Sequence, residues 1–505
     1  MKLLFLIALL FPMIFLSIRH KRWYLYLPFG LLGILPEQFA VQIHEKLPLL
    51  SGSRVLILIF FGFWLYDRWK HKRFSMPWSL GIFMGINILV SLVNFRYGFG
   101  EVNRIFVTVF ECVLLAVMAA DLIRDKEEFR RCVDFMLMGS AALAVIAIVQ
   151  TVFEYDIASV LHLRQTMASV SISDRMGMTR AYGTFNAISY GCYCTFMMIP
   201  AYYRLRQTKS QWYSLIFAIN FVALICTFTR SAWLCIAGVM ALMVLVYRWK
   251  MIRLLVPSAV ISLALCAALC VAQPRLWSAF VETGKSGLNT VISVLPDGVQ
   301  EFLTPEKTEK PRPTDPVAME KPTPTEPVQT TTPPAQTKPP ADHSGSKNPF
   351  QLDENFGMNG EDPTYTRVVQ WTAVKYMIED GQAWFGYGYN AFPEGRLHYF
   401  YDRWGAKWEV ANTLDVGLVA LITEGGFVGA ASFLGLLGYM LVISLWKKKK
   451  GTFDFYQVTI FMIGLFLLLN YLASFMFDDA VWLFIALFYA YHRLEKRTVS
   501  QLEET

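Results

Sequence analysis

The chain has 505 residues, of which 55% are hydrophobic, 15% aromatic and only 17% charged, and its mean hydropathy is +0.39. A set of soluble domains of this length would carry more charge, so the composition excludes that class of protein. The net charge of +7 does not indicate a nucleic-acid partner, because the basic residues form short clusters between apolar runs. These features predict an all-α polytopic membrane protein.

Apolar runs long enough to cross a bilayer recur along the chain, since about 20 residues suffice for each crossing. The first apolar run is expected to be a membrane span and not a cleaved signal peptide, because no small-residue cleavage site follows it. We expect 12 or 13 transmembrane helices. The predicted spans are residues 3–18, 23–36, 53–66, 78–95, 104–123, 132–153, 181–203, 211–228, 231–247, 254–272, 418–445, 455–474 and 479–492.

The basic clusters predict the orientation of these spans. They occupy residues 19–22, 68–73, 124–131, 204–209, 248–253, 447–450 and 493–497. The positive-inside rule places them in the cytoplasm. The predicted organisation is then an N-terminal transmembrane bundle, a large extracytoplasmic loop, C-terminal transmembrane helices and a cytoplasmic tail. These regions cover residues 1–272, 273–411, 412–492 and 493–505.

The large loop divides by composition. Residues 304–347 are rich in proline and threonine and poor in aromatic residues. Such a segment buries too little apolar surface to fold, so we expect a disordered insert that acts as a spacer or stalk.

A helical motif region is predicted over residues 362–392. Arg367, Trp371, Val374 and Ile378 share one helical face. Gly381 is expected to end that helix.

The loop that follows reads GYGY from Gly386. Glycines at 386 and 388 would allow the backbone to approach a ligand closely.

Two arginines are candidate anion contacts. Arg230 lies between two apolar runs, at the outer end of both. A charge at such a boundary is costly and usually functional, and the planar guanidinium suits a diphosphate. The alternative is a snorkelling arginine that anchors the membrane interface. For Arg367 the alternative is an ordinary solvated helix face.

Asp415 is the candidate general base, because it stands alone at the start of an apolar run. Partial burial would raise its pKa toward values useful for proton removal. The alternative is that it caps the following helix. Glu424 is half a turn out of phase with Asp415, so the two do not form a carboxylate pair. We expect Glu424 to orient the turn at Gly425–Gly426.

The remaining sequence predicts neither a metal site nor a cofactor. Most of the eight cysteines lie in apolar runs without metal-ligand spacing, and we interpret them as small buried residues. The cytoplasmic loops are too short for a nucleotide-binding domain. Any reaction would therefore use a substrate that was activated beforehand, on the outer side.

The chain resembles the O-antigen ligase/O-antigen polymerase family of bacterial envelope glycosyltransferases. The resemblance rests on TFTRSAWLCIAGV from residue 227, RVVQWTAVKYMIEDGQAWFGYGYNAF from residue 367 and DVGLVALITEGGFVGAASFLG from residue 415. A weaker match is RAYGTFNAISYG from residue 180. Together these motifs cover about residues 180–445 without the insert.

The resemblance implies a location in the bacterial cytoplasmic membrane and a polyprenyl-diphosphate-linked glycan as donor. The acceptor would be a glycan, a lipid or the cell wall. Arg230 and Arg367 would hold the diphosphate, with Trp371, Gly386 and Gly388 as further substrate-binding residues. Asp415, at a position where ligases of the family often carry histidine, would activate the acceptor hydroxyl.

Within that family, ligase and polymerase both remain open, since Val416 and Leu418 replace residues usual in ligases. Two other classes of function also fit the composition. One is a multi-span transporter or flippase of lipid-linked envelope precursors, which commonly has 12 spans and charges at broken helices. The other is an envelope scaffold whose working part is the stalk.

Overall fold

The structure is a computed structural model. Besides a few isolated positions, it describes residues 22–32, 51–71, 76–154, 180–182, 187–247, 249–292, 371, 373–389, 391, 416–448, 453–472 and 479–503. The predicted insert, Arg367 and Asp415 lie outside the described residues. The chain divides into two compact units, one formed by Met1–Ser286 with Thr364–Thr505 and the other by Gly287–Pro363. Apart from the end of helix α13, every described element belongs to the first unit.

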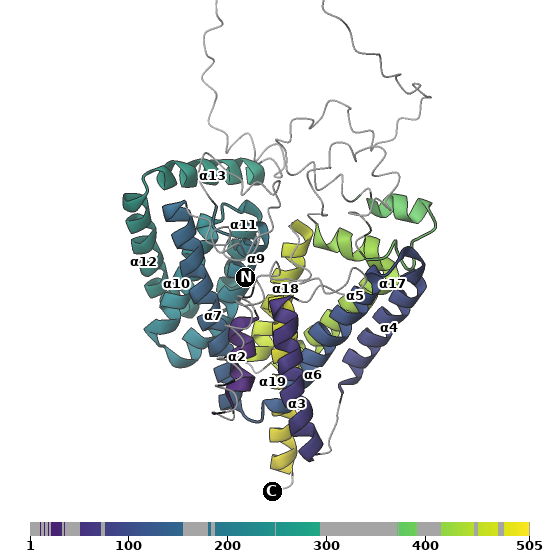
Figure 1. The fold of residues 1–505 in the computed structure, drawn as a ribbon. Coiled ribbons are helices and arrows are strands. Elements are labelled where there is room, and N and C mark those ends of the chain that lie inside the picture. Colours follow the sequence, from purple (N-terminus) through teal and green to yellow (C-terminus); the bar gives the residue numbers. More distant parts are fainter. Residues whose placement is uncertain are drawn as a thin grey trace, which may run out of the picture. The chain divides into compact units, whose positions relative to one another are not determined.

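The described residues form helices and connecting turns, without strands (Figure 1). The first part of the chain forms α2 (Trp23–Leu31), α3 (Gly52–His71), α4 (Trp78–Asn94), η1 (Phe95–Tyr97), α5 (Gly100–Phe106), η2 (Val107–Leu114), α6 (Leu115–Leu122) and α7 (Lys126–Phe153). It continues with α9 (Ala187–Thr208), α10 (Gln211–Cys226), α11 (Arg230–Tyr247), α12 (Trp249–Ala272) and α13 (Arg275–Ile292). The C-terminal part forms α17 (Gly417–Lys447), α18 (Phe455–Leu472) and α19 (Asp479–Glu503).

Six stretches of the described chain are helical, long and apolar enough to cross a membrane. They are Trp78–Tyr97, Gly100–Leu122, Lys126–Phe153, Arg230–Tyr247, Ile252–Ala272 and Gly417–Lys447, and two shorter apolar helices cover Gln211–Cys226 and Phe455–Tyr471. These helices support the predicted all-α multi-pass membrane protein. The expected total of 12 or 13 crossings stays a prediction.

Helices from the predicted N-terminal bundle and from the predicted C-terminal region pack into the same unit. Helix α17 contacts α4, α18 contacts α9 and α11, and α19 contacts α6. Large side chains such as Phe129, Tyr190, Phe455 and Phe488 are fully buried in the shared core. Within a bilayer this dense packing, rather than exclusion of water, is what holds helices together.

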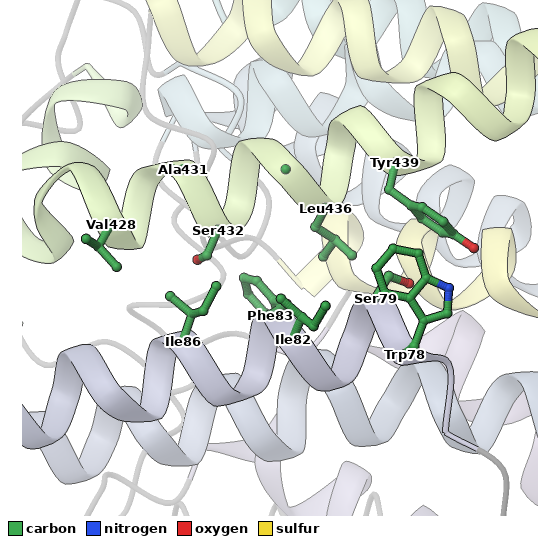
Figure 2. A pocket seen from close by; sticks show the side chains of 11 residues that line it. Trp78, Ser79, Ile82, Phe83, Ile86, Val428, Ala431, Ser432, Leu436 and Tyr439 are labelled. Atoms are coloured by element: carbon green, nitrogen blue, oxygen red, sulfur yellow. The ribbon is translucent and has the colours of Figure 1, made fainter.

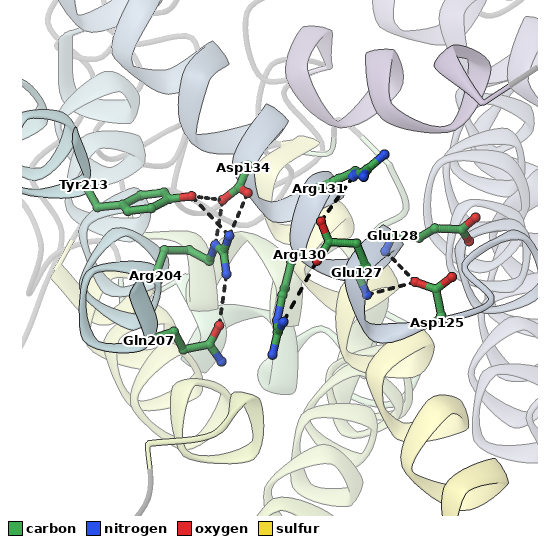
Figure 3. A network of polar contacts seen from close by, with 9 residues as sticks. All are labelled: Asp125, Glu127, Glu128, Arg130, Arg131, Asp134, Arg204, Gln207 and Tyr213. Atoms are coloured by element: carbon green, nitrogen blue, oxygen red, sulfur yellow. Dashed lines mark hydrogen bonds and ion pairs between the residues drawn. The ribbon is translucent and has the colours of Figure 1, made fainter. Parts of the chain in front are cut away.

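One polar network fixes helices α7, α9 and α10 to one another (Figure 3). Arg204 donates from Nε and Nη2 to the two oxygens of Asp134, at 2.6 and 2.7 Å. Tyr213 donates its hydroxyl to the same carboxylate at 2.6 Å. A bidentate, charge-assisted contact of this kind has a defined geometry, so it sets how the three helices are oriented.

The structure differs from the predicted elements at three places. Residues 96–103 separate the predicted spans 78–95 and 104–123 and were therefore expected to form a loop, but α5 already begins at Gly100, after a tight turn in which Gly98 has φ +131°. The predicted span 104–123 contains the π-helical segment η2. Helix α13 lies in the predicted large loop, in a part for which no helix was predicted, and its residues Leu276 and Ala279 are buried.

Candidate functional site

Helix α17 is broken at Gly426, which has φ +63° and ψ −173°. Glycine adopts this conformation without steric cost. In a continuous helix the amides of Phe427 and Val428 would bond to the carbonyls of Thr423 and Glu424. The break leaves all four backbone groups in need of other partners. Such partners are obligatory in the low-dielectric interior of a membrane protein.

The glycine loop, residues 381–389, supplies those partners. The amides of Tyr387 and Gly388 donate to the carbonyls of Thr423 and Glu424, at 2.8 and 3.0 Å. In the other direction, the amides of Phe427 and Val428 donate to loop carbonyls.

These acceptors are the carbonyls of Ala383 and Trp384, at 2.9 and 3.1 Å. The loop therefore replaces, bond for bond, the helical turn that α17 lacks.

Glycine is required on both sides of this junction because the two backbones lie so close. A Cβ at Gly386 would lie 2.5 Å from the carbonyl oxygen of Thr423, and one at Gly426 would lie 2.3 Å from the carbonyl of Trp384. At Gly386 the close approach in the structure is to the backbone of α17. Contact of Gly386 or Gly388 with a ligand stays a prediction.

Helix α4 holds the same loop from another direction. Asn94, which is fully buried at the end of α4, donates from Nδ2 to the carbonyl of Phe385 at 2.6 Å. Close by, Arg96 donates from Nη2 to Oε1 of Gln382 at 2.7 Å. The loop is therefore fixed by side chains as well as by the backbone of α17.

Helix α5 places two buried charges under the junction. Glu101 is 1% exposed and Arg104 is 9% exposed. The amide of Tyr389 donates to Glu101 Oε1 at 2.6 Å, and Arg104 donates from Nη1 to the carbonyl of Glu424 at 3.0 Å. The Nη2 of Arg104 packs on Gly425, where a Cβ would lie only 2.5 Å away.

These two charges are only partly satisfied by the described part of the chain. Arg104 forms no ion pair within 4.0 Å among the described residues, although the carboxylates of Glu101 and Glu424 act on its charge, and the buried Oε2 of Glu101 has no hydrogen-bond partner there. Ionisable side chains inside a membrane domain usually line substrate or ion pathways. Arg104 thus places a buried positive charge next to the α17 break, within the electrostatic influence of Glu101 and Glu424.

A second polar junction surrounds Arg230, the first residue of α11. The preceding turn contains Phe228 at φ +51°. Arg180 braces this turn, donating from Nε to the carbonyl of Thr227 at 2.7 Å and from Nη2 to Oγ1 of Thr229 at 3.0 Å. Two arginines therefore lie at the turn between α10 and α11. Arg230 itself is partly buried, as both interpretations of it require.

The structure places the predicted site residues that it describes in three positions. Gly386 and Gly388 meet the α17 break. Trp371 lies on the preceding helical segment, where its ring is 6.1 Å from that of Tyr471 at the end of α18. Arg230 starts α11, which also packs on α18. Arg367 and Asp415 lie outside the described residues, although Asp415 is two residues before the first residue of α17.

The predicted helix around Trp371 has its expected end. Residues 373–379 are helical and Gly381 follows in the left-handed region at φ +71°. At the Gly425–Gly426 turn the backbone carbonyl of Glu424 accepts from both Gly388 and Arg104, and the expected role of the Glu424 side chain stays a prediction.

Sequence reasoning missed Asn94, Glu101, Arg104 and Arg180 as candidate site residues. A usable signal existed for two of them, because Glu101 and Arg104 are spaced by three at the start of an apolar run. Assigning residues 96–103 to a loop hid that spacing. Arg180 stands at the start of the quoted RAYGTF segment, but its contact with the α10–α11 turn spans 47 positions.

An apolar groove of about 400 Å³ lies between α4 and α17 (Figure 2). Trp78 and Tyr439 stand at one end of it, and Ile86 and Val428 stand toward the other. Val428 donates its amide to the glycine loop. The groove therefore runs along the two helices up to the α17 break.

Comparison with known proteins adds no relative: no family model, no curated protein and no solved structure matches the chain. The described residues also contain no group of three or more metal-ligating side chains. Fold and site together define a class, that of helical multi-pass membrane proteins with a broken helix closed by a glycine loop.

Proposed function

We propose that the chain is a membrane glycosyltransferase of the O-antigen ligase/polymerase type. It would transfer or polymerise a glycan from a polyprenyl-diphosphate carrier onto an acceptor hydroxyl, at the outer face of a bacterial cytoplasmic membrane. The observation that carries the proposal is the glycine loop closed over the α17 break, with Arg104 buried beneath it. Two of the sequence motifs that carry the family resemblance, those from residues 367 and 415, meet at this junction.

The reaction needs little machinery because the lipid diphosphate is already a good leaving group. The acceptor oxygen attacks the anomeric carbon, and the bond from that carbon to the diphosphate oxygen breaks. The acceptor proton passes to the carboxylate of Asp415. Arg230 and Arg367 stabilise the negative charge that develops on the departing diphosphate.

In this proposal the α4–α17 groove binds the hydrocarbon tail of the polyprenyl carrier. Its lining is apolar, as the hydrocarbon chain of a polyprenyl carrier requires, and it leads to the α17 break. A polyprenyl carrier whose hydrocarbon tail lies in the groove would have its diphosphate end directed toward Arg104. The glycan attached to the diphosphate would then extend toward Trp371 and toward the glycine loop.

A transporter of lipid-linked precursors is the second candidate, and one observation favours it. Broken helices with buried charges often form the substrate site of transporters, and α17 with Glu101 and Arg104 has both features. The two candidates differ in one measurable respect, since only the transferase makes a new glycosidic bond.

Substitution of Asp415 tests the proposed chemistry. Asp415→Asn keeps the shape and the capping ability but cannot take up a proton, so it should be nearly inactive. Asp415→His should keep measurable transfer, because histidine accepts a proton near neutral pH. The assay is transfer from polyprenyl-diphosphate glycan by the purified protein in proteoliposomes.

Asp454→Asn is the matched control, because Asp454 is a helix cap in the structure. Its carboxylate accepts from the amide of Gln457 at 3.1 Å. Asparagine caps about as well as aspartate, so this variant should keep its activity. Full activity of Asp415→Asn would make Asp415 a cap as well and remove it from the chemistry.

A further inference from the structure

Asp121, at the end of α6, joins three helices at the opposite end of the bundle from the glycine loop. Its side chain is fully buried. It forms ion pairs with Arg68 of α3 and Arg493 of α19, and it accepts from Nε1 of Trp64 at 3.2 Å. Two basic clusters that lie more than 400 positions apart in sequence thus meet on one carboxylate.

Two further arginines extend this cluster. Arg124 follows Asp121 by three residues, and its only ion pair in the described part of the chain is a 3.5 Å contact with Asp67. Arg497 lies one helical turn beyond Arg493, so the two share a face of α19. Arg497 is exposed, and it forms no ion pair within 4.0 Å among the described residues. Four arginines therefore surround two aspartates.

The positive charges of this cluster act on one another. Arg497 lies beyond the last predicted span, and although its side chain is exposed, partial desolvation by the protein atoms around it lowers its pKa. The neighbouring Arg493, Arg124 and Arg68 lower it further, against the opposing effect of Asp121. The nearby pairs of Arg22 with Glu128 at 2.8 Å and of Lys126 with Glu495 at 2.7 Å are balanced in charge. These two pairs therefore leave the positive charge of the four arginines uncompensated.

An exposed apolar surface adjoins the cluster. On α3, Tyr66 is 68% exposed and Trp69 is 88% exposed, and they flank Arg68 in sequence. Tryptophan and tyrosine are enriched where a membrane protein meets the headgroup region. An amphiphile with an anionic head and an apolar tail matches this arrangement, whereas a free anion would have no use for the apolar part.

We propose that Arg68, Arg124, Arg493 and Arg497 form a binding site for the phosphate of an acidic phospholipid, whose acyl chains lie along the exposed face of α3. Arginine suits this role because its planar fork binds phosphate oxygens in a bidentate manner. Acidic phospholipids are held by basic pockets between transmembrane helices. The inference does not depend on the proposed transferase activity.

The test uses the full-length protein in nanodiscs of zwitterionic lipid, titrated with cardiolipin and with phosphatidylcholine. Binding is read by native mass spectrometry. Arg497→Gln should weaken cardiolipin binding about fivefold, since each basic residue near an anionic lipid surface contributes at that scale. Because the Arg497 side chain is exposed and unpaired among the described residues, the variant leaves the core intact.

Lys496→Gln is the matched control, because it removes the same charge from the adjacent, exposed position of α19. It should leave cardiolipin binding unchanged, and neither variant should alter phosphatidylcholine binding. Equal losses in Arg497→Gln and Lys496→Gln would overturn the site, because only net charge would then matter. Displacement of cardiolipin by inorganic phosphate at equal concentration would overturn the lipid as its ligand.

Discussion

Gly386→Ala tests whether the glycine loop depends on its close approach to α17. The chain offers a matched control in Gly381→Ala, because both glycines have φ +71°. The left-handed conformation costs a non-glycine residue about 1–2 kcal/mol, and this cost is common to both variants. Around Gly381 a new Cβ would meet nothing within 4 Å.

At Gly386 the new Cβ would overlap backbone atoms, which cannot rotate away as a side chain can. It would lie 2.5 Å from the oxygen of Thr423, 2.6 Å from the nitrogen of Gly426 and 2.8 Å from the carbonyl carbon of Glu424. The loop must then withdraw, and at least the bonds from the amides of Tyr387 and Gly388 are lost. At about 0.5–1.5 kcal/mol per bond, undocking becomes easier by about 1–3 kcal/mol beyond the shared strain.

Hydrogen exchange of the purified protein measures this difference at the affected amides. In Gly386→Ala, the amides of Tyr387, Gly388 and Phe427 should exchange about 5- to 150-fold faster than in Gly381→Ala, which is the same free energy expressed as a rate ratio. Equal protection of these amides in the two variants would refute the docking of the loop in the α17 break.

Three further predictions concern charged side chains. Arg104→Gln should speed exchange at the junction and lower transfer activity, because a buried charge-assisted bond to the Glu424 carbonyl contributes about 1.5–3 kcal/mol; exchange and activity like those of wild type would make Arg104 a bystander. Arg230→Lys and Arg367→Lys should each lose most transfer activity with normal expression, since lysine lacks the bidentate fork; a fully active Arg230→Lys would favour the snorkelling interpretation. Asp134→Asn should lower stability by about 3 kcal/mol in thermal unfolding, because it leaves the Arg204 charge unpaired; an unchanged midpoint would argue against the network.

The helices were largely predictable because each one is a local apolar run. The ends at Gly381 and near Cys226, and the loop at Gly386, follow from glycine chemistry and composition. The transmembrane assignments needed only runs of about 20 apolar residues. The error at residues 96–103, where a loop was expected and α5 begins, involves only a few residues. It nevertheless concealed Glu101 and Arg104.

Long-range pairing was not predictable, and it is what forms the candidate site. The contact of Glu101 with Tyr389 joins residues 288 positions apart, and that of Arg104 with Glu424 joins residues 320 apart. Periodicity and composition contain no information about such partners. The turn at Gly425–Gly426 was expected, but its closure by the glycine loop depends on backbone hydrogen bonds between distant segments and was equally hidden.

The most important prediction is that the site at the α17 break makes a glycosidic bond. The most direct measurement is reaction of wild-type protein in proteoliposomes with polyprenyl-diphosphate-linked glycan and an acceptor glycan, followed by mass spectrometry of both lipid and glycan products. The account predicts a lengthened or newly linked glycan together with released polyprenyl diphosphate in equal amount. Passage of intact lipid-linked glycan across the bilayer without any new glycosidic bond would contradict it.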